Sequence, residues 1–131
     1  GMTLAAVPAM AQEAEEPRTT YSVRMLEFAE GADQERWLEM MDTYIQPARR
    51  AAGMAPETVH WVMMNDDVDL IIVSEVPGGM ATFDSHAPAS RAAFVEALTE
   101  LAGGEEQLEA MGEEMDAMFE TSKTVFTHTH P

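Results

Sequence analysis

Hydrophobic positions follow two different periods along this chain, and the changes of period mark its elements. Residues 58–76 (TVHWVMMNDDVDLIIVSEV) consist of two apolar, β-branched and aromatic runs separated by the polar cluster Asn65, Asp66 and Asp67. Asn and Asp tolerate a positive φ and bond to their own backbone, so such a cluster between apolar runs is typical of a turn. The stretch therefore predicts a β-hairpin.

This predicted hairpin is apolar on both faces. The second arm, residues 70–73 (LIIV), has no polar interruption, and the first arm places apolar residues on both parities: Val59, Trp61 and Met63 on one, Val62 and Met64 on the other. A strand with one face in water would alternate apolar and polar residues. Both faces are thus expected to be covered. The pairing of the two arms stays open, because a one-residue change in loop length exchanges the faces.

The first half of the chain predicts a strand followed by a helix. Residues 20–28 (TYSVRMLEF) have the composition of a strand, and residues 34–52 carry apolar positions at three- and four-residue spacing, the period of an amphipathic helix. Gly53 ends this helix. Pro47 lies inside it and lacks a backbone donor, so we expect a kink or break near Gln46.

The second half predicts helices and one more strand. A short helical turn is expected at residues 80–83, a helix at 89–101, a second helix at 105–121 after the break at Gly103, and a strand at 123–130. The first of the two helices is expected to turn its apolar residues inward: Ala92, Phe94, Val95, Leu98 and Leu101. The stripe of the second consists of Leu108, Met111, Met115, Met118 and Phe119.

The resulting order, β-α-β-β-α(α)-β, predicts an α+β fold of the ferredoxin-like type with a four-stranded antiparallel sheet. Residues 20–131 are long enough for a single domain with its own core. Helices on one face of the sheet leave the other face uncovered. The apolar character of that face predicts that a second sheet packs against it.

Residues 1–19 are expected to lie outside this domain. Gly1 before Met2 is typical of a residue left by tag removal, and residues 3–11 (TLAAVPAMA) end in Ala9-Met10-Ala11. Small apolar residues that end in A-x-A fit the tail of a secretory signal peptide, here cleaved before Gln12. The alternative is a disordered, Ala-rich leader. On the signal-peptide interpretation the mature protein is periplasmic or secreted.

Charge and cysteine content exclude several functions. The chain has 24 Asp and Glu residues against 7 Lys and Arg, a formal net charge of −17. Such a field repels phosphate backbones and anionic lipids, so binding to nucleic acid or to a membrane is not expected. The absence of cysteine excludes disulfides, thiolate catalysis and cysteine-based zinc sites.

The order and length of these elements over residues 20–130 resemble the dimeric α+β-barrel superfamily. This superfamily includes antibiotic-biosynthesis-type monooxygenases, haem-degrading enzymes and stress-responsive barrel proteins, in which the sheets of two subunits pack face to face. The resemblance implies a homodimer. The apolar hairpin, with Val23, Met25 and Phe126 on the neighbouring strands, supplies more apolar strand surface than two helices can cover, which also favours a homodimer.

His60 and Trp61 are the first candidates for a site. They are neighbours on a central strand, so one is expected to face the helices and the other the barrel interior. A buried His60, with Tyr21 or Tyr44 nearby, could act as a base in a cofactor-independent oxidation or hold a haem iron. Equally, His60 could be hydrogen-bonded and inert.

His86 is a further candidate, because loops on a rigid scaffold often carry function. It lies in the segment SHAP, where it either gates the mouth of a pocket or simply precedes the helix that starts after Pro88. A barrel that binds a small apolar molecule near His60, Trp61 and His86 is the favoured function. The alternatives are a monooxygenase-type enzyme and a structural dimer without a ligand.

Metal binding is a weaker possibility. His128 and His130 lie on one face of the last strand, a spacing that suits one zinc or copper ion together with Glu75 or His60. The alternative is that they are a pair of surface histidines near the chain end. Thioethers bind Cu(I), so the methionines of the second helix stripe could do so, although Met at helical spacing usually fills a core. We therefore expect no cofactor.

Overall fold

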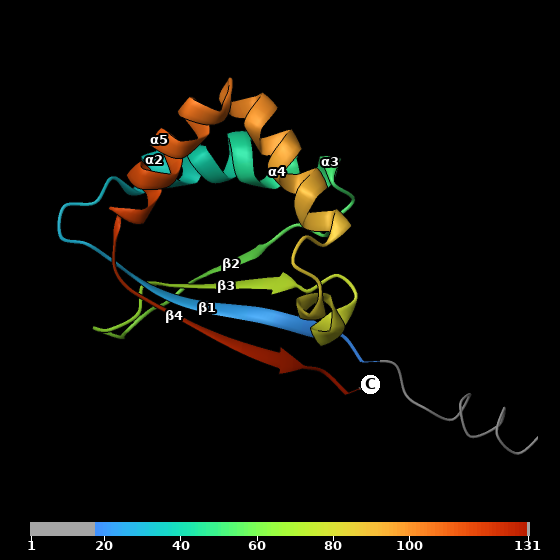
Figure 1. Cartoon of the computed structure of the whole chain (residues 1–131). Coiled ribbons are helices and arrows are strands. Elements are labelled where there is room, and N and C mark those ends of the chain that lie inside the picture. Colours follow the sequence, from blue (N-terminus) through green and yellow to red (C-terminus); the bar gives the residue numbers. More distant parts are fainter. Residues whose placement is uncertain (1–17, 131) are drawn as a thin grey trace, which may run out of the picture.

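The computed structural model describes residues 18–130 and shows one sheet with helices on a single face (Figure 1). The predicted signal-peptide motif lies outside the described residues. Along the chain the elements follow in this order: β1 (Thr20–Phe28), α2 (Gln34–Met40), a π-helical turn (Met41–Ile45), α3 (Gln46–Ala51), β2 (Thr58–Trp61), β3 (Leu70–Glu75), a 3-10 helix (Gly79–Asp84), α4 (Ala89–Ala102), α5 (Glu105–Asp116) and β4 (Phe119–His128).

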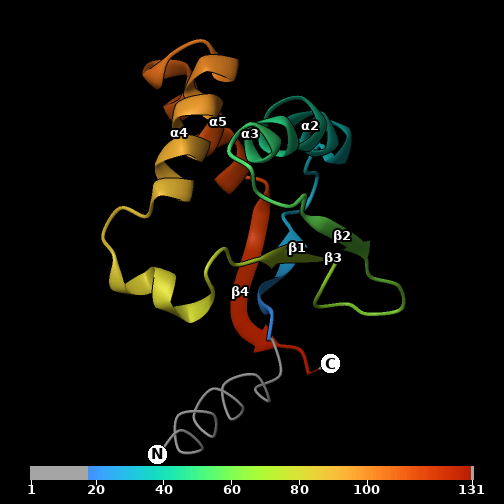
Figure 2. The same cartoon turned by 90° about the vertical axis from the view of Figure 1, so that its right-hand side faces the viewer.

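The four strands are antiparallel and lie in the order β2-β3-β1-β4. This is the ferredoxin-like arrangement that the element order predicted. Figure 2 shows the pair α2–α3 next to the pair α4–α5, both above the same face of the sheet. Within residues 18–130, none of the helices α2 to α5 covers the opposite face, which we call the open face (Figure 1).

The core lies between the sheet and these helices. Residues opposite each other in neighbouring antiparallel strands point to the same face, and Leu26 stands opposite Leu70 on the helix side. Both are buried, as is Ile72, and they pack with Trp37 of α2. Full burial of such a side chain contributes roughly 1.5–3 kcal/mol. The remaining buried apolar residues are Phe28, Met40, Met41, Ala48, Leu98, Met111 and Met118.

Where a kink or break was predicted near Gln46, the structure has a π-helical turn. The N–H of Gln46 donates to the carbonyl of Met41, five residues earlier, instead of four. Pro47 then lies in the first turn of α3, where no intrahelical donor is required. The extra residue in the turn separates α2 from α3 without interrupting the right-handed backbone.

The hairpin differs from its prediction in loop length. The strand β2 ends at Trp61, and Met63 and Met64 lie exposed in the loop rather than in the first arm. The turn itself is as expected, since the side chain of Asn65 accepts hydrogen bonds from two backbone N–H groups. Asp69 closes the loop against β1: its N–H donates to the carbonyl of Leu26, 2.8 Å away.

The junction of α5 and β4 also differs from its prediction. The helix ends at Asp116 and the strand begins at Phe119, whereas the apolar spacing predicted a helix to residue 121. The ring of Phe119 stacks on that of Phe28 at 4.9 Å between centroids, and β4 pairs with β1 along its whole length. These tertiary contacts outweigh the local helical spacing. A register shift beside Phe28 absorbs the early start of the strand.

Phe126 was counted among the apolar strand residues that two helices cannot cover, but it stands opposite Ser22 and therefore lies on the helix side of the sheet. The orientation expected for α4 is partly wrong. In α4, Leu98 is buried, but Ala92, Val95 and Leu101 are exposed although all three were expected to point inward. The apolar residues of α4 surround the helix instead of forming one stripe, which is why their spacing gave the wrong face.

An ion pair joins the two helix pairs. The Nε and Nη2 atoms of Arg36 in α2 donate to both carboxylate oxygens of Glu114 in α5, at 3.0 and 3.1 Å. This hydrogen-bonded contact holds the pKa of Glu114 below its usual range. Both side chains are partly exposed, so the pair orients the helices more than it stabilises them.

No helix among the described residues is long and apolar enough to cross a membrane.

Candidate functional site

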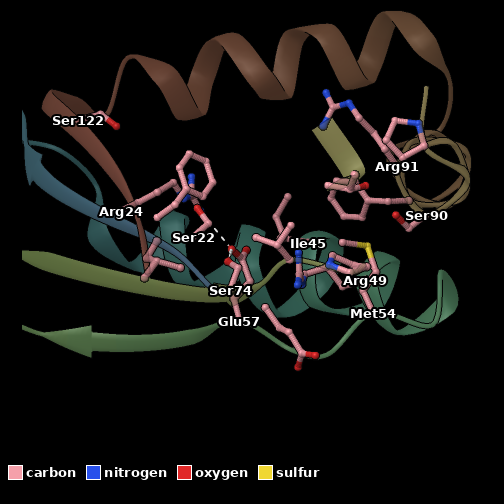
Figure 3. A pocket seen from close by; sticks show the side chains of 18 of the residues that line it. Ser22, Arg24, Ile45, Arg49, Met54, Glu57, Ser74, Ser90, Arg91 and Ser122 are labelled. Carbon is pink, nitrogen blue, oxygen red and sulfur yellow. Dashed lines mark hydrogen bonds and ion pairs between the residues drawn. The ribbon is translucent and has the colours of Figure 1, made fainter. Parts of the chain in front are cut away.

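A cavity of about 790 Å³ lies between the helix-facing side of the sheet and the helices. Strands β1, β3 and β4 form its floor, α3 and α4 form its sides, and the 3-10 helix and the loop before α4 lie at one end. Its apolar lining includes Trp37, Ile45, Ile72 and Phe94. Figure 3 shows how the polar side chains enter it from both layers.

Glu57 is the best-anchored polar residue of this pocket. The side chain of Gln46 accepts from the N–H of Glu57 at 2.9 Å and donates to its carbonyl at 2.8 Å, which fixes the backbone before β2. The carboxylate accepts hydrogen bonds from Arg24 Nη2 at 3.2 Å and from the hydroxyl of Ser74. Only 7% of the Glu57 side chain is exposed, so its charge is compensated by a partner instead of by solvent.

Arg49 is the second buried charge of the pocket. The residue is 7% exposed, and its Nε donates to the carbonyl of Ala55 at 2.9 Å. Its Nη2 atom is buried without a hydrogen-bond partner within residues 18–130. No ion pair between described residues involves Arg49. In Figure 3 its side chain extends from α3 into the pocket, toward the side on which Glu57 and Ser74 lie.

The charge of the pocket contrasts with that of the chain. Three of the seven basic residues line it, namely Arg24, Arg49 and Arg91, as do three of the 24 acidic residues, namely Glu57, Glu75 and Asp116. A strongly acidic protein therefore places a large share of its positive charge at one cavity. Because Arg24 already neutralises Glu57, Arg49 is left as the uncompensated charge of the interior.

The predicted ligand-binding residues are distributed over both faces of the sheet. His86 lines the pocket as an exposed residue of the loop before α4. Trp61 lies on the helix side and packs edge-on against Trp37, and Tyr44 packs against the core. His60 stands opposite Ile71 and Tyr21 opposite Thr127, both on the open face. The sequence was therefore right that His60 and Trp61 face opposite sides.

The candidate metal ligands do not gather into a cluster. The rings of His128 and His130 lie 4.7 Å apart at the end of β4, while Glu75 stands opposite Tyr21 at the end of β3. Within residues 18–130, no three His, Asp or Glu side chains come close enough to hold a metal ion. Of the helix methionines, Met111 and Met118 are buried core residues.

Sequence reasoning did not identify the four polar residues that characterise the pocket: Arg24, Arg49, Glu57 and Ser74. For two of them the sequence does contain an indication. Arg24 has the same strand parity as the buried Leu26, and Arg49 follows Ala48 within an apolar helix face. A charged residue at a core-facing position is rare unless it is paired or functional.

Comparison with known proteins supports the fold. No protein-family model matches the sequence, and no curated protein matches it significantly. A solved structure of a nipsnap family protein with unknown function, from Agrobacterium tumefaciens, has a similar fold with a TM-score of 0.54. The two share 11% sequence identity over 86% of this chain and 88% of that chain. The likeness shows a common fold. It assigns no activity to the pocket.

Proposed function

We propose that this protein binds a small, largely apolar molecule in the cavity between its sheet and its helices. The observation that carries the proposal is the cavity itself, at about 790 Å³. Ligand pockets typically occupy roughly 300–1,000 Å³ and combine an apolar lining with a few polar groups. The lining of Trp37, Ile45, Ile72 and Phe94, interrupted by a few arginine, glutamate and serine side chains, has this character.

The end of the cavity beside the 3-10 helix supplies an entrance. Phe83 of that helix and Phe126 of β4 both line the cavity, with ring centroids 5.3 Å apart, and both are half exposed. His86 lies in the next loop and also lines the cavity. Aromatic rings at the mouth give an apolar ligand a surface to contact as it leaves water.

Homodimerisation through the open face is the second part of the proposal. Val23 stands between Val73 and Val125 on this face, and Met25 stands beside Ile71. All five are half-buried in the single chain although no described helix lies over them. A second copy offers the same apolar row, so two sheets packed face to face bury both. This is the packing of the dimeric α+β-barrel proteins that the sequence resembles.

An oxidative or haem-linked activity has less support than binding. The prediction of such an activity depended on His60 as a base or as a haem ligand. His60 lies on the open face, on the opposite side of the sheet from the cavity. Among the described residues, the histidine that lines the cavity is His86, which is exposed at its end. One exposed imidazole at an entrance is a poor axial ligand for a buried haem.

Titration with Nile red, a neutral dye that fluoresces in apolar surroundings, tests the proposal. We expect saturable binding with one site per chain. In a Ser22→Phe variant the new ring enters the cavity from β1, so the affinity should fall at least about tenfold, a loss typical of steric exclusion from an apolar pocket.

A matched control places the same ring elsewhere. Thr43 is exposed in the π-helical turn and does not line the cavity, so Thr43→Phe should bind the dye like the unmodified protein. Equal affinity of the unmodified protein and Ser22→Phe would place the dye outside the cavity and contradict the proposal.

A further inference from the structure

Arg49 indicates which chemical class the cavity accepts. Taking the proposed binding function as given, we infer that the ligand is a monocarboxylate with an apolar body, whose carboxylate pairs with Arg49 while its body lies against Trp37, Ile45 and Phe94. The inference rests on the burial and hydrogen-bonding state of this one guanidinium and on the charges around it.

The first step is that Arg49 keeps its charge. A guanidinium is not deprotonated in a protein, so burial cannot neutralise it as it can neutralise a buried lysine or carboxylic acid. One donor, Nε, is satisfied by the carbonyl of Ala55, but Nη2 is buried without a partner. An unpaired, buried, charged donor is costly, and a carboxylate is the partner that compensates it best.

The second step is that the surrounding residues leave this charge available. Arg24 and Ser74 both engage Glu57, which makes the neighbouring polar cluster electrically neutral. Arg91 is exposed at the first turn of α4, where water screens its charge. Glu75 and Asp116, the other acidic residues that line the cavity, are exposed as well, and among the described residues neither pairs with Arg49. The buried part of the cavity therefore has one positive charge without a counter-charge, which matches a monoanion better than a dianion.

The third step is that the walls around Arg49 select the rest of the ligand. Ile45 precedes it by one turn of the helix, and Met54 follows in the loop after α3 (Figure 3). Both line the cavity with Arg49. An inorganic anion would leave this apolar surface in contact with water. An organic acid covers it, so the apolar body contributes affinity and the carboxylate fixes the orientation.

The test compares four eight-carbon compounds that differ in head group, measured by calorimetry on the intact protein. Octanoate should bind at least about tenfold more tightly than octanol, the gain expected of a charge-assisted hydrogen bond. Octyl phosphate, a dianion at neutral pH, and octylamine, a cation, should both bind more weakly than octanoate. Octanoate no tighter than octanol, or octyl phosphate tighter than octanoate, would overturn the inference.

Arg49→Gln locates the effect. In this variant octanoate should bind no more tightly than octanol, because its carboxylate would be buried without a counter-charge. Measurable octanol binding to the variant shows that the cavity is intact. Arg50→Gln removes the neighbouring exposed arginine of the same helix and should change neither affinity. A preference for octanoate that persists in Arg49→Gln would also overturn the inference. If Arg49→Gln does not fold, the comparison of head groups on the unmodified protein still decides.

The two proposals fail in different ways. If octanol and octanoate bind equally, the cavity binds small molecules without recognising a carboxylate, and only the inference about Arg49 is wrong. If none of the four compounds binds and Nile red does not bind either, the proposed function is wrong and the inference falls with it.

Discussion

At the scale of single residues, the polar side chains that characterise the cavity occupy positions at which the hydrophobic pattern predicts apolar residues. Arg24 and Ser74 occupy core-facing positions of β1 and β3, and Arg49 follows a fully buried alanine. Their residue types and parities are readable from the sequence. Their convergence on one cavity is not, because it depends on how α3 lies over the sheet.

Asp69 shows how one carboxylate ends a strand pairing. Its Oδ2 accepts the N–H of Phe28 at 2.8 Å, where β3 no longer reaches β1. Asp69→Ala would leave that part-buried donor unsatisfied and should lower the free energy of unfolding by about 1–3 kcal/mol, measured by urea denaturation. Asp69→Asn keeps an acceptor oxygen and should retain most of the stability.

Asp67→Ala is the control for that loss, since Asp67 is exposed in the same loop and its side chain makes no hydrogen bond among the described residues. It should be close to neutral. An Asp69→Ala protein as stable as Asp67→Ala would show that the hydrogen bond to Phe28 contributes nothing.

At the scale of elements, the sequence predicted the number, type and order of the strands and main helices because each has a clear period. The strand β1 has the predicted bounds, and the helix that contains Pro47 changes to a π-helical turn just before it. The predicted ends of several elements were wrong. The loop after β2 is longer than a tight turn because Asp69 pairs with β1, and β4 starts early because Phe119 stacks on Phe28. Both are contacts between distant segments, which local spacing does not contain.

The sheet register decided which face each candidate residue occupies. The sequence left this pairing open, since a one-residue slip moves every side chain to the other face. The observed pairing of Trp61 with Leu70 turns Trp61 toward the helices and His60 away from them. The pairing of β1 with β4 likewise places Phe126 opposite Ser22 on the helix side, which the spacing within the last strand alone does not give.

At the scale of the whole molecule, the open face predicts the oligomeric state. Sedimentation equilibrium at micromolar concentration should give twice the 14.4 kDa mass of one chain. Val73→Asp places a charge in the centre of the apolar row and should abolish folding, the result expected if the proposed dimer is obligate. Ala92→Asp, on an exposed part of α4, should leave the dimer intact. A single species of 14.4 kDa at all concentrations would contradict the proposed dimer.

The net charge and the location of the protein are also properties of the whole molecule. The net charge of −17 opposes association of two copies. The row Val23, Met25, Ile71, Val73 and Val125 is uncharged, and the acidic residues at open-face positions of β1 and β3, Glu27 and Glu75, lie beyond its ends. Export of the protein stays a prediction that rests on residues 3–11, outside the described residues.

The most direct measurement of the central claim is a crystal structure from crystals soaked with octanoate. The account predicts density for the alkyl chain between the sheet and α4, in contact with Trp37, with the carboxylate at hydrogen-bonding distance from the Arg49 guanidinium. Density for the ligand on the open face alone, or a cavity closed by the side chains that line it, would contradict the claim that this protein binds small molecules between its sheet and its helices.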